Sequence, residues 1–116
     1  MFPTYSYFRK YKRDDELRKH KDGPSCEISV SLYLEYEAAT PWPLWIDGHE
    51  APAAVPLQPG DAMLYKGVEC AHWREPFEGD HLVQVFLHYV DQRGPYAEWK
   101  YDKRKSLAEL RPTDDH

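Results

Sequence analysis

One segment of this chain alternates apolar and polar side chains without a break: Ser25-Cys26-Glu27-Ile28-Ser29-Val30-Ser31-Leu32-Tyr33-Leu34-Glu35-Tyr36-Glu37. Residues two apart in a strand point to the same side of the sheet. The apolar side chains from Cys26 to Tyr36 therefore share one side, and the serines and glutamates share the other. This period of two predicts a long, half-buried β-strand over residues 25–37.

Shorter segments on either side also have the composition of strands. Residues 3–12 are rich in tyrosine and phenylalanine, and residues 82–90 form the most apolar run, which predicts a strand covered on both faces. Many short strands separated by turn signals predict an all-β sandwich or barrel. Further strands are expected at 17–22, which runs into Gly23-Pro24, and at 42–46, 62–65 and 70–73; the stretch 51–56 is rich in alanine and proline and is assigned no element.

The C-terminal region predicts a different local structure. Ser106-Leu107-Ala108-Glu109 has the spacing of a capping box, and Arg111-Pro112 would end the helix that it starts. The chain has 116 residues, which fits one domain. We therefore expect a single domain over 1–116, with a β core over about 3–90 and a tail over 91–116 that carries a short helix.

Charge and composition argue against several classes of protein. The net charge is −5 and the isoelectric point is about 5.6, so a general nucleic-acid binder is not indicated. No apolar run approaches the ~20 residues that span a bilayer, and no leader is evident. Cys26 and Cys70 form no CxxC pair, which favours a reducing compartment. These features predict a soluble, cytoplasmic protein without nucleic-acid or membrane partners.

Three residues have the side chains of a metal site. His20 and Asp22 are two apart, so in an extended segment their imidazole and carboxylate would face one ion. His72 could complete a set of two histidines and one carboxylate, the facial triad that leaves open positions on Fe(II). Plainer readings are a solvated His20–Asp22 pair and a half-buried His72. His88 is an alternative third ligand, or a hydrogen-bonded histidine of the core.

The order of these motifs resembles a known family. His20-x-Asp22 is followed by a long β region, then by Pro59-Gly60-Asp61, and then by His72 with Pro76 and Gly79 after it. Over roughly residues 5–90 this pattern resembles the 2-oxoglutarate- and Fe(II)-dependent dioxygenase superfamily, in particular a short form of its prolyl-hydroxylase-like branch.

The resemblance implies a fold, a metal and a reaction. The fold would be a double-stranded β-helix, also called a jelly roll or cupin-like fold, in which His20, Asp22 and His72 bind Fe(II). The cosubstrates would be 2-oxoglutarate and O₂, and the reaction would hydroxylate a C–H bond with release of succinate and CO₂. Iron and cosubstrate carry the oxidative step, while the protein supplies positioning and exclusion of water.

Members of this superfamily usually bind the far carboxylate of 2-oxoglutarate with an Arg or Lys on the last core strand, two residues after a glycine. Here that position, two after Gly79, is His81, and an imidazole does not replace the guanidinium fork. The resemblance therefore leaves three candidates for the carboxylate and three tyrosines that could add hydrogen bonds: Arg9, Arg74 and His81, in that order, with Tyr5, Tyr7 and Tyr11.

Two other functions stay open at this point. The chain could be a jelly-roll binding or scaffold module with a vestigial metal site, or a cupin-like metal enzyme that does not use 2-oxoglutarate. The substrate could be a small molecule or a peptidyl residue. Few residues precede the first predicted strand, and exposed apolar surface would favour a homodimer.

Overall fold

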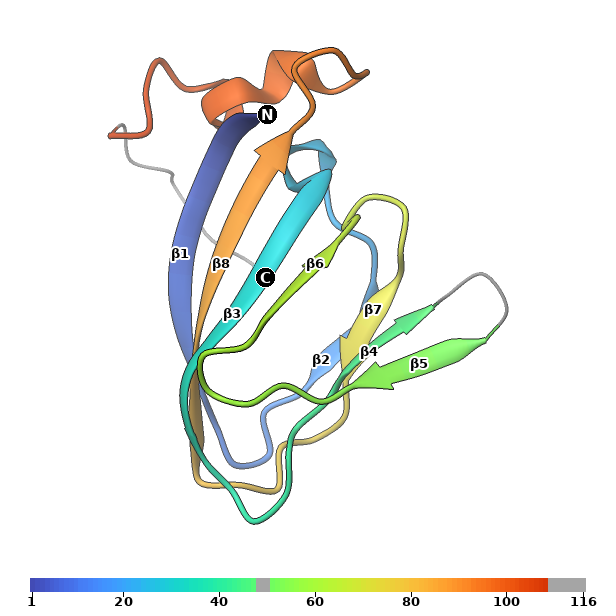
Figure 1. The fold of residues 1–116 in the computed structure, drawn as a ribbon, viewed down its shortest axis with the longest axis vertical. Helices are drawn as coiled ribbons and strands as arrows, with labels where there is room; N and C mark the ends of the chain where they lie inside the picture. The colour runs from blue at the N-terminus through green and yellow to red at the C-terminus, as the bar shows by residue number, and fades with distance from the viewer. Residues whose placement is uncertain (48–50, 109–116) are drawn as a thin grey trace.

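The computed structural model describes residues 1–47 and 51–108, and its architecture there is two four-stranded antiparallel sheets (Figure 1). The larger sheet has the strand order β1 (Phe2–Lys12), β8 (His81–Val90), β3 (Ile28–Glu37) and β6 (Ala62–Tyr65). The smaller sheet has the order β2 (Leu17–His20), β7 (His72–Arg74), β4 (Leu44–Asp47) and β5 (Pro52–Val55). The predicted all-β jelly roll is confirmed.

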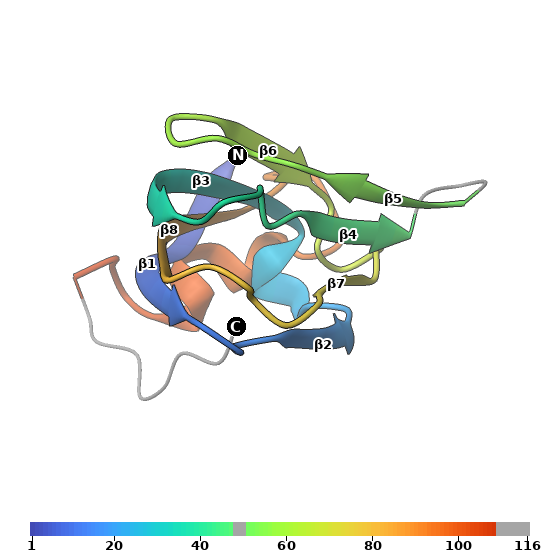
Figure 2. The same ribbon diagram turned by 90° about the horizontal axis from the view of Figure 1, so that it is seen from below.

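The two sheets face each other across one core. Seen from below, the larger sheet lies on the left and the smaller sheet on the right, and each shows the strand order given above (Figure 2). Aromatic side chains fill much of the space between them, as expected from the 15% aromatic content. The buried cluster consists of Tyr11, Tyr33, Trp42, Leu57, Phe77, Leu82 and Phe86. No helix in the described ranges is long and apolar enough to cross a membrane.

Strand β3 confirms the expected alternation but buries the opposite side. Ser29, Ser31 and Tyr33 are fully buried, whereas Leu34 is 50% exposed. The serines lie inside because the interior contains polar partners for them: the Ser29 hydroxyl lies 2.8 Å from Nδ1 of His88. A pattern of period two specifies two faces, but it identifies the inner face only where the interior is apolar.

The beginning of this strand also differs from the prediction. Pro24–Cys26 form a short 3₁₀ turn, η1, with proline at its first positions, and the strand starts at Ile28. Proline fixes φ near the helical value, so it starts such a turn readily. Cys26, expected on the apolar side of the strand, is buried in this turn instead.

Strand β8 was expected to be covered on both faces, but the described residues cover only one of its faces completely. Every second residue points inward and is completely buried, from Leu82 through Gln84 and Phe86 to His88 and Val90. The intervening residues are half-buried. The outer side of the larger sheet is therefore apolar in sequence without a complete layer over it.

Two local predictions need correction or completion. Residues 52–55, to which the sequence assigned no element, form the edge strand β5, which pairs with β4. Alanine and proline are poor strand formers, so only the pairing reveals this strand. The helix expected from Ser106 falls partly on Glu109, Arg111 and Pro112, which lie outside the described residues, and 106–108 are bends and turns. The helical turns described near this end are η2 (Ala97–Lys103).

Candidate metal centre

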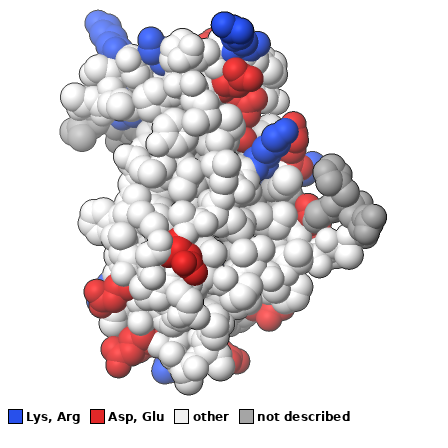
Figure 3. Space-filling view, in the orientation of Figure 1, with Lys and Arg blue, Asp and Glu red and all other residues white. Residues whose placement is uncertain are grey.

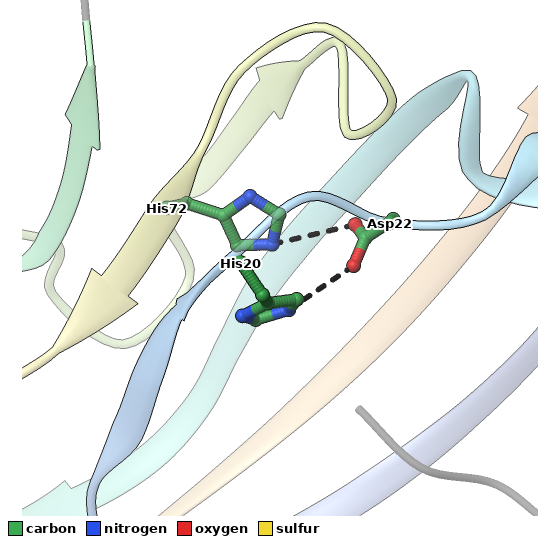
Figure 4. Close-up of side chains that lie close together, drawn as sticks. All are labelled: His20, Asp22 and His72. Atoms are coloured by element: carbon green, nitrogen blue, oxygen red, sulfur yellow. Dashed lines mark ion pairs between the residues drawn. The ribbon is translucent and has the colours of Figure 1, made fainter.

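The three predicted metal ligands meet at one end of the smaller sheet. His20 ends β2 and lies directly opposite His72 on the paired strand β7. Asp22 follows two residues later, and its two oxygens lie 3.2 Å from Nε2 of His20 and 3.3 Å from Nε2 of His72 (Figure 4). One ligand atom from each residue falls within 4.8 Å of the others. The strand pairing thus unites residues that are far apart in sequence.

Both imidazoles are held by the same kind of backbone contact. Nδ1 of His20 lies 2.6 Å from the carbonyl oxygen of Arg18, and Nδ1 of His72 lies 2.9 Å from that of Cys70. A carbonyl only accepts, so each Nδ1 carries the donated hydrogen. Each Nε2 faces Asp22: in the protonated ring it donates to the carboxylate, and in the neutral ring it presents a lone pair to a metal ion. Metal-binding histidines are usually oriented in this way.

The carboxylate lies in a largely water-free position. The Asp22 side chain is 7% exposed and that of His72 is fully buried. Burial alone would raise the pKa of Asp22, but hydrogen bonds from His20 and His72 outweigh it and hold this pKa at about 2. The hydrogen bond to Asp22 in turn raises the pKa of His20 above its usual value, against the opposite effect of burial.

Gly67 is a functional residue that sequence reasoning did not identify. Its carbonyl accepts a hydrogen bond from the Asp22 amide at 2.8 Å. A Cβ at this position would lie 2.5 Å from Oδ2 of Asp22 and 2.7 Å from the carbonyl oxygen of Cys26. Glycine is required here because the backbone passes directly against the carboxylate. The sequence shows a glycine five residues before His72, but it does not show this contact.

The donor set fits a ferrous ion. Two neutral imidazoles and one carboxylate suit Fe(II), and three protein ligands leave positions open for other molecules. His88 is not part of this group: it is 1% exposed, and its Nδ1 lies against the Ser29 hydroxyl, which itself donates to the Cys26 carbonyl. A hollow of about 510 Å³ is lined by sequence neighbours of the ligands, including Lys21, Cys70 and Ala71, and not by the ligands themselves.

Arg74 occupies the interior of the jelly roll. It lies two residues after His72 on β7, on the same buried face, and its side chain is almost completely buried. Its guanidinium donates to Oε1 of Gln84 at 2.6 Å and to the Tyr33 hydroxyl at 2.9 Å, both on the larger sheet. Its Cζ also lies 4.9 Å from the ring centre of Trp42. None of these partners carries a negative charge.

Several polar atoms around Arg74 lack partners within 1–47 and 51–108. These are Nε of Arg74, Nε2 of Gln84 and the hydroxyl of Tyr11. Buried polar groups are seldom left unpaired without a reason, because each costs roughly 1–3 kcal/mol. A buried guanidinium without a carboxylate is costlier still. These atoms mark the interior beside β7 as a place suited to a polar, anionic ligand.

Of the other residues predicted to bind the cosubstrate, some lie close to Arg74 and one does not. Arg9 lies on β1 opposite Gln84, with its guanidinium 4.5 Å from the ring centre of Tyr11. Tyr11 is fully buried and also lies beneath Arg74, 5.2 Å from its Cζ. His81 points to the outer face of β8, where it contacts Glu35 at 2.7 Å and Asp80 at 3.1 Å. The structure therefore brings Tyr11 and Arg9 to Arg74, and it does not bring His81 there.

Tyr5 and Tyr7 lie on the same strand but have other neighbours. The Tyr5 hydroxyl lies 3.1 Å from Sγ of Cys26, and its ring lies 4.5 Å from that of His88. The Tyr7 ring stacks on Phe86. A tyrosine that sequence reasoning passed over, Tyr65, packs edge-on against His72 at 5.1 Å, and burial raises its pKa. Its position at the end of β6 gave no such signal.

Comparisons with known proteins give structural neighbours only. No family model matches the sequence, and no curated protein matches it. A prolyl-4-hydroxylase from Pseudomonas putida superposes with a TM-score of 0.64 at 16% identity, covering 75% of this chain and 51% of the hydroxylase. The nickel complex of the non-heme monooxygenase ThoJ gives 0.60 at 14% identity, covering 79% of this chain and 45% of the enzyme.

A cupin domain from Bordetella pertussis gives a TM-score of 0.50 at 14% identity, covering 74% of this chain and 80% of the domain. This chain thus spans about half the length of the hydroxylase and less than half of the monooxygenase. At these identities the likeness concerns the fold. The chain has the cupin-like jelly-roll fold, with a His-Asp-His group that could hold a metal ion.

Proposed function

We propose that this chain is an Fe(II)- and 2-oxoglutarate-dependent oxygenase that hydroxylates a C–H bond of a small-molecule or peptidyl substrate. The observation that carries the proposal is the convergence of His20, Asp22 and His72 within 4.8 Å, with both Nδ1 atoms held by backbone carbonyls. When bound, Fe(II) with 2-oxoglutarate and O₂ supplies the oxidising chemistry, and succinate and CO₂ are released.

Within this proposal, Arg74 is the residue that would hold the far carboxylate of 2-oxoglutarate. The sequence ranked Arg9 first. Three observations support Arg74 instead: it lies on the strand and face of His72, it has only neutral partners, and its Nε is unpaired within the described ranges. A dicarboxylate would provide the negative charge that this buried cation lacks. The unpaired Tyr11 hydroxyl and Gln84 amide would add hydrogen bonds.

The protein's own contribution is orientation and exclusion of water. The full burial of His72 and the backbone contacts of both imidazoles fix the ligand geometry before metal arrives.

An anaerobic titration tests both parts of the proposal separately. Addition of Fe(II) and then 2-oxoglutarate should produce a weak visible charge-transfer band, and aerobic incubation should release succinate. His72→Ala should abolish both metal binding and the band. His81→Ala is the matched control, because this histidine lies on the outer face with Glu35 and Asp80, and it should leave both unchanged.

The outcomes distinguish the candidate functions. Tight Fe(II) binding without the band would retain the metal centre and reject 2-oxoglutarate, in favour of a cupin-like metal enzyme. Absence of metal binding in folded protein would reject the enzyme reading and favour a binding module.

A further inference from the structure

The outer side of the larger sheet carries a continuous apolar surface. We call it the outer sheet face and define it by the outward-pointing residues of β1, β8, β3 and β6. Phe8 on β1 is 73% exposed, and Leu64 on β6 is 69% exposed. Between them lie half-buried valines and leucines of the two central strands, namely Val83, Val85 and Leu87 on β8 and Val30 and Leu32 on β3.

This surface is larger than isolated exposed side chains would make it. Single apolar residues on a surface are normal, but contiguous ones across four strands mark an interaction site. Within 1–47 and 51–108, Leu107 reaches only one end of the face, near Ser6 and Leu87. Figure 3 shows part of the face over β3 and β6, where uncharged side chains predominate.

Strand register arranges the outer sheet face in rows. Two rows are apolar at the centre, with Leu87 beside Val30 and Val85 beside Leu32. The next two rows carry opposite charges at their ends. The register gives Lys10–Val83–Glu35 in one and Lys12–His81–Glu37 in the other, always with the lysine on β1 and the glutamate on β3.

This pattern is complementary to itself. Consider two copies packed face to face and related by a two-fold axis that lies between them, parallel to β8. In this arrangement β1 of one copy lies over β3 of the other, and each row of one copy meets the same row of the other. Lys10 and Lys12 of one copy would then face Glu35 and Glu37 of the other, twice in each pair. The apolar rows would meet apolar rows, with Phe8 opposite Leu32. Such an isologous contact is what two-fold symmetry requires, and sheets pack face to face with aligned strands.

We propose that the outer sheet face binds a second copy of this chain, as a two-fold dimer with its axis along β8. From strand and residue spacings the face measures about 450 Å² per copy, so the dimer would bury close to the ~1,000 Å² at which specific interfaces begin. The dimer is therefore concentration-dependent. Both metal centres stay outside the interface, because the ligands lie on the smaller sheet. The inference is independent of the proposed activity.

Sedimentation velocity with the whole chain from about 1 µM to about 200 µM tests the dimer. A shift from monomer to dimer mass within this range is expected. Phe8→Ser should remove the dimer without unfolding the chain, since this side chain is 73% exposed, whereas Leu64→Ser is the matched control, because β6 lies beyond the edge of the partner's β1 in this arrangement. A chain that stays monomeric at the highest concentration overturns the proposal, as does a dimer that Phe8→Ser leaves unchanged.

Charge reversal tests the arrangement itself. One variant carries Lys10→Glu and Lys12→Glu, and a second carries Glu35→Lys and Glu37→Lys. In the proposed dimer each variant alone places like charges opposite each other and should be monomeric. An equimolar mixture places opposite charges at every contact and should dimerise. A mixture that stays monomeric, or single variants that dimerise as the parent does, would exclude this geometry. Monomeric parent protein that sediments with phosphatidylcholine vesicles would assign the face to lipid.

Discussion

Replacement of Gly67 by alanine should disable the metal centre while leaving the jelly roll folded. The new Cβ would lie 2.5 Å from Oδ2 of Asp22, whereas ordinary contacts begin at 3.4 Å, so the carboxylate must retreat by about 0.9 Å. The Cys26 carbonyl, at 2.7 Å, belongs to the backbone and cannot yield as easily. The displacement therefore falls mainly on the ligand.

Ligand positions have to be held to within roughly 0.5 Å, and loss of supporting contacts at metal sites typically costs 10–100-fold in affinity. We expect a loss of this size for Gly67→Ala. Calorimetric titration with Mn(II) or Ni(II) measures it without oxygen chemistry, and circular dichroism with a thermal melt reports whether the fold persists.

Gly23→Ala is the matched control. This glycine adjoins Asp22, but a Cβ there would meet nothing within 4 Å, and its φ of −75° suits any residue. Metal affinity should equal that of the parent. If Gly67→Ala also binds metal as the parent does, close packing against Gly67 is not what positions Asp22.

Three further predictions concern the same interior. Arg74→Leu should abolish the 2-oxoglutarate-dependent band and raise the melting temperature of the metal-free protein, whereas Arg9→Leu should do neither; the reverse result would restore Arg9 as the carboxylate ligand. His88→Gln should retain metal affinity and lower the free energy of unfolding by about 1–3 kcal/mol, because the imidazole is buried and bonded to Ser29; lost metal binding in the folded variant would make His88 a ligand. In the metal-free protein the lowered pKa of Asp22 stabilises the folded state above pH 3.8, and about 2 kcal/mol of this stabilisation should be lost as pH falls to about 2. The raised pKa of His20 stabilises the folded state below pH 6.5, and this stabilisation should be lost as pH rises through the raised pKa. Chemical denaturation across pH should show Asp22→Asn without the acid-side loss, and an unchanged profile would contradict the pairing.

The metal ligands were predictable because their chemistry leaves a local mark. A histidine and an aspartate two residues apart point to the same side of a strand, and a distal histidine within a β pattern completes the set of three metal ligands. Their convergence depends on the pairing of β2 with β7, which brings His20 opposite His72. The strand pattern predicted two extended segments but contained nothing that paired them.

The inner face of β3 could not be predicted by the same reasoning. Alternation assigns apolar residues to the core, yet Ser29 and Ser31 are buried and Leu34 is half exposed. In the interior Ser29 lies against His88 and Ser31 against Tyr65, so the polar side of β3 faces inward and its apolar side lies on the outer sheet face. The role of Gly67 and the neutral surroundings of Arg74 also arise only from three-dimensional contacts.

The pairing of His20 with His72 has a consequence for local motions of the chain. The two residues end a loop of about 50 residues, and β2 and β7 are among the shortest strands, with four and three residues. An ion held by both would act as a cross-link, and closing a loop of this length is worth about 4 kcal/mol in the chain-entropy view. Amide hydrogen exchange in these two short strands should therefore slow on metal loading towards the rates of β8, while β1 and β3 should be largely indifferent. The metal would then determine how long β2 and β7 stay paired.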